Sequence, residues 1–345
     1  MNLAKKHPDL TLILLSTFFT IILAEIFLRL SGIGYGNDPM NSDARLHHVH
    51  PKNYHFLAYD PRGEFGGFEI FYDAFGYRVQ TKNPAQHKVD PTRRIAFLGD
   101  SFTVANQLNW EQSFIGLIES NNPSILIRNF GVTSYSPILY LVQMQNEVKS
   151  FQPTDVIIQI YRNDFFDDQR YLKSANSQRL SEIKAINGGP SSNLIKILRS
   201  SYLARLIRKA QLRLKFSLLQ QTNKTNENVP LDVQTRSTET ERKQTYETIL
   251  LLKRIANEIN ARIFIFVVPN KELAMQHQCC DTDILTIEVK NFAASNNINF
   301  IDVAETFGNH PEQSKLFFTI DGHLTAKGHA ATEEAISNKL GISQN

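Results

Sequence analysis

The sequence of 345 residues has little that would support a disulfide framework or a metal site. Its two cysteines, Cys279 and Cys280, are adjacent, whereas disulfide frameworks and zinc sites need spaced cysteines. The net charge of +3 is too small to indicate a nucleic-acid-binding protein. We also find no internal repeat and no low-complexity tract. What remains is a chain that is 42% hydrophobic and large enough to bury a full core.

The small net charge is unevenly distributed. From Lys184 to Asn226 there are nine Lys or Arg and no Asp or Glu, so this basic segment carries +9 and the rest of the chain carries −6. Leu194 to Leu219 places apolar residues at mixed helical spacings between the cations, which predicts one or two amphipathic helices. Three roles stay open for the segment: a lid, a surface for anionic lipid headgroups or polyanionic glycans, or a solvated helical face.

The N-terminus contains the one long apolar run. It extends from Leu10 to Ala24 and continues to about Leu30, which approaches the roughly 20 residues that cross a bilayer as a helix. Lys5 and Lys6 precede the run, and positive flanks stay on the cytoplasmic side. The pattern predicts a single-pass protein of the inner (cell) membrane, with everything after residue 32 on the periplasmic side.

The end of this run does not look like a cleavage site. Ala24 is followed by Glu25, Ile26 and Phe27 rather than by a polar mature start. We therefore interpret residues 1–32 as a cytoplasmic stub and an uncleaved signal anchor; a cleaved signal peptide and a buried helix of a soluble protein are the alternatives. Glu25 and Arg29 are i, i+4 neighbours that can pair near the outer interface.

The rest of the chain alternates between strand-length apolar runs and helix-length segments. Residues 33–92 come first, as an irregular extension of loops and short strands, and 93–345 form the main domain with a basic helical insertion at about 165–240. Near-continuous apolar strands separated by helices predict an α/β fold with a parallel sheet of about five strands covered on both faces. The expected strands are Ile95–Leu98, Ile125–Phe130, Val156–Ile160, Ile263–Val268 and Ile298–Val303.

Polar residues follow three of these strands, at the sheet edge where α/β proteins bind ligands. Ser101 lies on the turn after the first strand, where helix N–H groups favour a developing oxyanion; its alternative role is an ordinary N-cap. Gly131 follows the second strand and can expose its N–H without a side chain in the way. Asn163 follows the third strand and offers a neutral amide.

A candidate base and carboxylate lie together near the C-terminus. A serine nucleophile needs a base to take its proton, and the base needs a carboxylate to fix its tautomer. Asp321 and His323 supply both on one loop. His329 competes as the base, but its position inside the next expected helix favours a surface or packing role. Asp302, at the end of the last strand, is the alternative carboxylate.

Together these segments resemble the blocks of the SGNH hydrolases, also called the GDSL lipase/esterase family. The residues that match are Ser101 in block I, Gly131 in block II, Asn163 in block III, and Asp321 with His323 in block V. The sequence also resembles the membrane-anchored bacterial members in Glu25-x-x-x-Arg29 and in Gly76-Tyr77-Arg78.

The resemblance implies a flavodoxin-like three-layer sandwich and a serine esterase without metal or organic cofactor. Ser101, Gly131 and Asn163 would form the oxyanion hole. The sequence departs from the family in two places: only Gly322 separates Asp321 from His323, where members often have two residues, and Tyr161 and Arg162 precede Asn163 without the usual glycine. Arg162 either recognises an anionic substrate or is a surface arginine.

The expected activity is cleavage of an ester-linked acyl group, from a small molecule, a lipid or an acylated glycan, through an acyl-enzyme on Ser101. Two alternatives share the same residues or the same fold. One is an O-acyltransferase acting on a cell-envelope polysaccharide, and the other is a non-catalytic, membrane-tethered binding module. The complete set of Ser101, Asn163 and His323 argues against the second, because a scaffold has no need of it.

Overall fold

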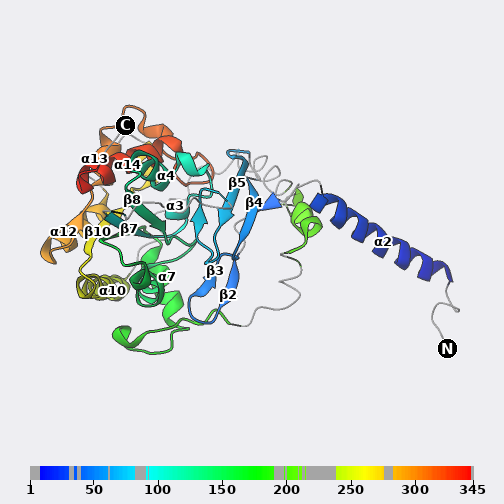
Figure 1. Ribbon diagram of the computed structural model, residues 1–345, viewed down its shortest axis with the longest axis horizontal. Helices are drawn as coiled ribbons and strands as arrows, with labels where there is room; N and C mark the ends of the chain where they lie inside the picture. The colour runs from blue at the N-terminus through cyan, green and yellow to red at the C-terminus, as the bar shows by residue number, and fades with distance from the viewer. Residues whose placement is uncertain are drawn as a thin grey trace.

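The computed structural model describes residues 8–30, 35–36, 40–60, 63–81, 91, 93–189, 198, 200–208, 210–211, 214, 238–275 and 283–342. Cys279, Cys280 and most of the basic segment lie outside this described part of the chain. Three parts follow one another along the chain: an isolated helix, a small β-rich extension and an α/β domain (Figure 1).

The α/β domain is built on one sheet whose five strands are all parallel. The strands are β7 (Arg93–Leu98), β8 (Ile125–Asn129), β9 (Asp155–Ile160), β10 (Arg262–Val267) and β11 (Asn299–Phe300). Their spatial order is β11-β10-β9-β7-β8. When the five are counted along the chain, this is the doubly wound order 2-1-3-4-5 of flavodoxin-like folds. The predicted fold class is confirmed.

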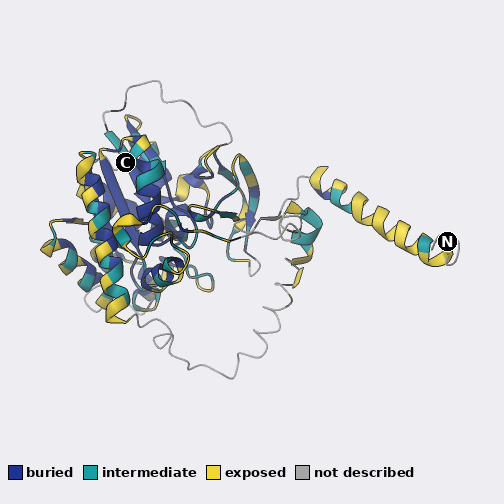
Figure 2. Ribbon diagram, turned by 90° about the horizontal axis from the view of Figure 1, so that it is seen from below, coloured by how far each residue is buried: buried dark blue, intermediate teal, exposed yellow. Residues whose placement is uncertain are grey.

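Each face of the sheet is covered by helices, because its strands are apolar on both sides. In β7, Ile95 and Phe97 belong to one buried cluster, and the alternate residues Ala96 and Leu98 belong to the other. The first cluster includes residues of α3 (Ser101–Val104), α4 (Phe114–Asn121), α13 (Val303–Gly308) and α14 (Ala326–Leu340). The second includes residues of α5 (Pro137–Gln143), α7 (Asp164–Leu172), α10 (Glu239–Glu258) and α12 (Ile284–Ser295). Figure 2 shows the buried sheet between the two helical layers.

The last strand is shorter than the sequence predicts. The apolar run from Ile298 to Val303 predicts six residues of strand, but β11 contains only two. Asp302 accepts a hydrogen bond from the Glu305 N–H at 3.0 Å and so caps α13, which begins at Val303. The chain therefore turns into a helix before the apolar run ends. β8 likewise ends one residue before Phe130.

The extension forms a separate mixed sheet that lies between the N-terminal helix and the main sheet (Figure 1). Its strands are β1 (Tyr35–Gly36), β4 (Tyr54–Tyr59), β5 (Gly66–Tyr72) and β6 (Arg78–Val79), in the order β1-β4-β5-β6. A second small hairpin pairs β2 (Asn41–Asp43) with β3 (His47–Val49). β4 and β5 form an antiparallel hairpin, and β1 pairs with β4 at Leu57 and Ala58.

Helix α2 (Pro8–Leu30) is 23 residues long, with a hydropathy of 2.3, and is exposed along almost its whole length (Figure 2). It is long and apolar enough to cross a membrane. Its C-terminal end contacts residues that are distant in sequence. The Glu25 carboxylate accepts hydrogen bonds from the Tyr202 and Leu203 N–H groups, and the Arg29 guanidinium donates to the Ser200 carbonyl.

The region expected to hold the insertion is partly described. α7 opens it, and the segment after α7 folds back onto the extension, where Ile183 and Ile186 are fully buried and Ile186 bridges to Leu46. Residues 202–208 are helical and lie beside the end of α2 (Figure 1). The described structure resumes at 238, where Thr238 caps α10.

Candidate active site

Three predicted site residues form one hydrogen-bonded chain. Ser101 begins α3 directly after β7. Its Oγ lies 2.8 Å from Nε2 of His323, and Nδ1 of His323 lies 2.5 Å from Oδ1 of Asp321. The order is hydroxyl, imidazole, carboxylate, which is the arrangement that lets a histidine take the serine proton while the carboxylate holds its tautomer. Segments 222 residues apart in the sequence supply the two ends of this chain.

The short spacing between Asp321 and His323 is accommodated by the backbone of Gly322. Its φ is +91°, in the left-handed region that favours glycine. The chain turns back at this residue, so that Asp321 Oδ1 accepts from the His323 backbone N–H at 3.3 Å as well as from the ring. One intervening residue is therefore enough to bring the carboxylate onto the imidazole.

The turn that carries Ser101 is fixed by buried polar groups. Asp100 caps α3 by accepting from the Phe102 N–H at 2.9 Å, and its own N–H donates to Oε1 of Gln159 at 3.0 Å. The Thr103 hydroxyl donates to the same Gln159 oxygen at 3.1 Å. Burial raises the pKa of Asp100 to about 6. Gln159 is not among the residues that the sequence motifs indicate, although a polar residue inside the buried strand β9 is a usable signal.

Gly131 lies directly against α3. A Cβ on this residue would come within 2.9 Å of Thr103, Val104 and Asn129, so any side chain would push α3 away. The Gly131 N–H donates to Oδ1 of Asn129 at 2.8 Å, and Nδ2 of Asn129 donates to the Thr103 carbonyl at 2.9 Å. Asn129 was also missed from sequence; it ties the second predicted block to the serine-bearing helix.

Asn163 lies at the N-terminus of α7, on the turn after β9. Its Nδ2 donates to Oδ2 of Asp167 at 2.6 Å, one helical turn further on. Since an amide carries two N–H bonds, one remains for another acceptor. Burial raises the pKa of Asp167, and the hydrogen bond from Asn163 opposes that rise. β8, β7 and β9 are neighbours in the sheet, so the turns carrying Gly131, Ser101 and Asn163 share one edge.

The Phe102 ring packs on the imidazole and in turn contacts Tyr161, on the turn after β9. The ring of Phe102 lies 4.8 Å from that of His323 and 4.6 Å from that of Tyr161, centroid to centroid. Arg162 follows on the same turn, with its guanidinium 4.0 Å from the Glu272 carboxylate. Its charge thus already faces a carboxylate on α11 (Lys271–Met275), which an anionic substrate group would have to compete with.

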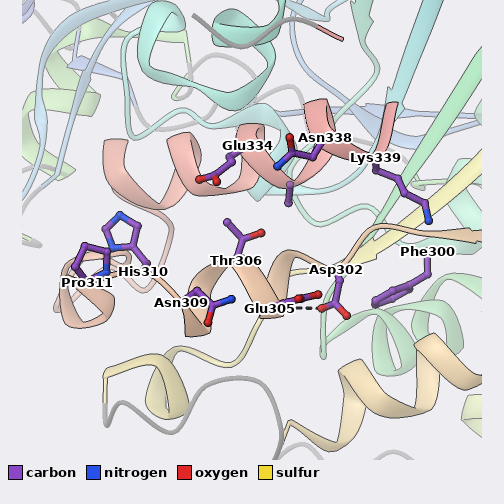
Figure 3. Close-up of a pocket in the computed structure, with 11 residues that line it drawn as sticks. Phe300, Asp302, Glu305, Thr306, Asn309, His310, Pro311, Glu334, Asn338 and Lys339 are labelled. Carbon is purple, nitrogen blue, oxygen red and sulfur yellow. Dashed lines mark hydrogen bonds between the residues drawn. The ribbon is translucent and has the colours of Figure 1, made fainter. Parts of the chain in front are cut away.

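The two competing residues take part in other interactions. His329 is buried within α14, stacks on the Phe114 ring at 5.5 Å, and its Nδ1 accepts from the Phe114 N–H at 3.2 Å. Burial lowers its pKa to about 3, so it is a neutral packing residue. Asp302 pairs with Lys290 at 2.6 Å as well as capping α13. Figure 3 shows Asp302 in a cavity between α13 and α14 that contains none of Ser101, Asn163 and His323.

Among the residues that the structure describes, no group of three or more His, Cys, Asp or Glu side chains is placed to hold a metal ion. No family model and no curated protein matches the sequence.

Several solved structures are similar to the chain. One is a catalytic mutant of an acetylxylan esterase from Geobacillus stearothermophilus, at 16% identity and a TM-score of 0.43 over 74% of this chain and 97% of the other. Another is a GDSL-like lipase from Bacteroides thetaiotaomicron, at 12% identity and 0.39 over 74% and 92%. A third is a putative lipolytic protein of the G-D-S-L family from Desulfitobacterium hafniense, at 14% identity and 0.42 over 72% and 99%.

All three TM-scores lie below 0.5, so the fold assignment rests on the strand order of this chain itself. The parallel order 2-1-3-4-5 places the turns after β7, β8 and β9 at one edge, and the hydrogen bond between Ser101 and His323 brings the C-terminal loop to the same edge. The chain has the flavodoxin-like α/β fold that its sequence predicts, with Ser101 and His323 brought together at one edge of the sheet.

Proposed function

We propose that this protein is a serine esterase that cleaves an ester-linked acyl group through an acyl-enzyme on Ser101. The observation that carries the proposal is the hydrogen-bonded chain from Ser101 Oγ through the His323 ring to Asp321. An isolated N-cap serine has no use for an imidazole at 2.8 Å that is itself held by a carboxylate. The contact of the Phe102 ring with His323 supports the proposal, because it limits the freedom of the base.

The residues define the proton transfers of each half-reaction. Ser101 Oγ attacks the ester carbonyl carbon while His323 Nε2 takes the hydroxyl proton, and Asp321 stabilises the resulting imidazolium. Collapse of the tetrahedral intermediate breaks the bond to the alcohol, which leaves with the proton from His323. Water then loses a proton to His323 as it attacks the acyl-enzyme, and the acid is released as Ser101 recovers its proton.

Charge develops on the carbonyl oxygen in both steps, and three donors are available for it: the N–H groups of Ser101 and Gly131 and the amide of Asn163. Each such donor contributes about 2.7 to 4 kcal/mol in measured oxyanion holes. The Asn163 amide has an N–H to offer beyond the one that Asp167 accepts. The Gly131 N–H is bonded to Asn129, so to act here it must be shared between Asn129 and the substrate oxygen.

Labelling with a fluorophosphonate probe tests the nucleophile, because only an activated serine reacts with it. We expect the full chain to be labelled and the Ser101→Ala variant not to be. A full chain that resists labelling would favour the non-catalytic binding module. A screen of p-nitrophenyl esters from acetate to palmitate then defines the acyl length, and the same assay with added polysaccharide acceptors separates hydrolysis from acyl transfer by its products.

We further propose that α2 is retained as a signal anchor, with the catalytic domain outside the cytoplasm. The contacts of Glu25 and Arg29 with residues 200–203 support retention of the end of α2, because cleavage after Arg29 would remove both side chains from the segment they contact. Lys5 and Lys6 support the orientation. An alkaline phosphatase fusion at Gly36 should be active; an inactive fusion there, with a fluorescent cytoplasmic reporter active at the same point, would reverse the orientation.

The helix at 202–208 is proposed to face the surface of the membrane. It adjoins the end of α2 and carries Arg205 and Arg208, and Ile207 is 51% exposed. Clustered cations gain about 1 kcal/mol each near an anionic surface. In nanodiscs with spin-labelled anionic lipid, a fluorophore attached at position 207 should be quenched, and one at the exposed Ile287 of α12 should not. Equal quenching at both positions would remove the membrane role of this helix.

A further inference from the structure

The loop that carries the catalytic base is held from outside the α/β domain. Glu64 lies in the loop of the β4-β5 hairpin, and its carboxylate accepts hydrogen bonds from two backbone N–H groups of this loop of the α/β domain. The Ile320 N–H lies 2.8 Å from Oε1 and 2.9 Å from Oε2, and the Asp321 N–H lies 2.6 Å from Oε2. These two N–H groups lie two and three residues before His323. A glutamate of the extension, 257 residues earlier in the chain, therefore binds the turn from which the carboxylate and the imidazole project.

Hydrogen bonds within the hairpin loop fix the backbone at Glu64 and so limit where its carboxylate can lie. The Glu64 N–H donates to the Asp60 carboxylate at 3.1 Å, and the Asp60 N–H donates to the Phe65 carbonyl at 2.9 Å. The ring of Phe65 packs on that of Phe318 at 5.4 Å, on the strand-like segment that leads into the loop. A polar and an apolar contact thus join the hairpin loop to the loop that carries the base.

Two further hydrogen bonds hold the same loop at other residues. The Phe318 N–H donates to the His323 carbonyl at 2.8 Å, and Lys271 donates to the Thr319 carbonyl at 2.6 Å. The first of these hydrogen bonds closes the loop between Phe318 and His323, and the second holds the loop at Thr319. Glu64 instead binds the Asp321 backbone itself. Hydrogen bonds to a charged acceptor are stronger than neutral ones. The contact with Glu64 is therefore well suited to fix the backbone of Asp321 and, with it, the orientation of the Asp321 carboxylate.

The extension holds the nucleophile as well. Arg78 is 2% exposed, and its guanidinium donates to the Val104 carbonyl at 2.7 Å and to the Leu108 carbonyl at 2.5 Å, where α3 ends. Positive charge at a helix C-terminus is favourable. The Gly-aromatic-Arg motif, which the sequence analysis left without a role, therefore binds the serine-bearing segment, while Glu64 binds the base-bearing loop.

We propose that Glu64 is a positioning residue of the active site, through which the extension aligns Asp321 and His323 with Ser101. The inference rests on the proposed esterase function. Removing the carboxylate frees the N–H groups of residues 320 and 321, and the Asp321 to His323 hydrogen bond loses its fixed geometry. Because Glu64 acts through the backbone of the loop, we expect the loss to fall on kcat and not on KM.

The experiment compares Glu64→Ala and Glu64→Gln with the same two changes at Glu69, an exposed residue of β5 in the same hairpin. On a soluble p-nitrophenyl ester, we expect kcat to fall about ten- to a hundred-fold in Glu64→Ala, as for loss of charged hydrogen bonds that orient a base. Glu64→Gln keeps one acceptor oxygen and should lie between Glu64→Ala and the unmodified chain. KM should stay within about twofold, and both Glu69 variants should match the unmodified chain.

A spectroscopic readout separates positioning from mere stability. The His323 Nδ1 proton, hydrogen-bonded to Asp321, should give a downfield ¹H resonance that His323→Ala removes. We expect this resonance to weaken or broaden in Glu64→Ala and to persist in Glu69→Ala, at a temperature below both thermal midpoints, where both variants are folded. If Glu64→Ala does not fold, the isosteric Glu64→Gln carries the same comparison.

The outcomes distinguish this proposal from the proposed function. An unmodified chain that fluorophosphonate does not label overturns the esterase, and the resonance still decides whether Glu64 orients His323. An unmodified chain that is labelled, together with Glu64 variants that keep its kcat, labelling rate and resonance, overturns the positioning role and leaves the esterase intact. A fall in kcat that the Glu69 variants share would also overturn it.

Discussion

The two halves of the candidate active site are supported in different ways. Ser101 lies on a turn whose polar groups are buried, with Asp100 2% and Thr103 1% exposed, and it is fixed by neighbours within the sheet. His323 and Asp321 lie on a loop whose side chains remain 23% and 15% exposed, and this loop is held by the β4-β5 hairpin. The nucleophile is thus fixed mainly by the core of the domain, with a further contact from Arg78 of the extension, whereas Glu64 of the extension binds the loop that carries the base.

This difference has consequences for how each half fails. A buried, hydrogen-bonded turn cannot move without opening the core, because its groups would lose their partners. A half-exposed loop can shift while the fold persists, since water replaces its lost hydrogen bonds. Changes on the nucleophile side should therefore act on chemistry and stability together, whereas changes on the base side should act mainly on chemistry.

The largest expected effect comes from removing the side chain of the nucleophile or of the base. Ser101→Ala and His323→Ala should each lower ester turnover by several orders of magnitude, about 10⁴-fold or more, and the double variant should cost little beyond either one, because the residues act as a unit. Steady-state kinetics of the purified variants checks this. A Ser101→Ala variant with the original activity, contamination excluded, would overturn the nucleophile assignment.

A smaller effect is expected at the shared oxyanion position. Asn163→Ala should reduce kcat about 100- to 1,000-fold with little change in KM, because the amide acts mainly in the transition state. Asp167→Asn provides a comparison: it removes the carboxylate that Asn163 binds but retains an amide oxygen as acceptor. It should cost less than Asn163→Ala. A KM that rises while kcat holds would instead place Asn163 in ground-state binding.

The base side can be tested alone at Gly322. An alanine there must adopt φ near +91°, at a cost of about 1 to 2 kcal/mol, with no neighbour within 4 Å of its Cβ. We expect the loop to relieve the strain by moving, so that kcat falls about tenfold. Gly189, at φ +73° and equally open, is the matched control. If Gly322→Ala and Gly189→Ala lower the melting temperature equally and leave kcat alone, the loop geometry is not limiting.

The last prediction concerns stability rather than turnover, at the buried His329. His329 has a folded-state pKa of about 3 against an ordinary 6.5, so below pH 6.5 the unfolded chain binds a proton that the folded chain does not. Stability should fall as pH drops from 6.5 toward 3, by about 1.4 kcal/mol per pH unit from this group. His329→Gln, which keeps an acceptor for the Phe114 N–H, should lose that slope in urea unfolding. Parallel curves for the two chains would contradict the assignment.

The sequence located most of the site residues but not their supports. Ser101, Asn163, Asp321 and His323 could be chosen because each lies next to a strand end or a helix start, which is a local pattern. Gln159, Asn129 and Glu64 could not be chosen in this way. Gln159 and Asn129 bind residues that follow a neighbouring strand, and Glu64 binds a loop of the α/β domain from the extension. These roles depend on contacts between distant segments, which a linear pattern does not contain.

Two element boundaries show the same limit. The apolar run after Ile298 predicts a full strand, but the cap at Asp302 ends it, since a side chain that satisfies helix N–H groups outweighs further strand pairing at the sheet edge. Residues 33–92 predict only loops and short strands. Their assembly into an ordered sheet depends on pairing between β4 and β5 and on packing against the α/β domain.

The sequence by itself determined the parallel α/β architecture and was enough to propose Ser101, His323 and Asn163 as candidate site residues, because alternating apolar runs and the residues at their ends are local properties. Only the tertiary structure decided that His323 and not His329 faces Ser101, that Asp321 rather than Asp302 holds the imidazole, and that Glu64 binds the base-bearing loop. These choices depend on which side chains meet after the chain has folded, and that is set by packing between distant segments.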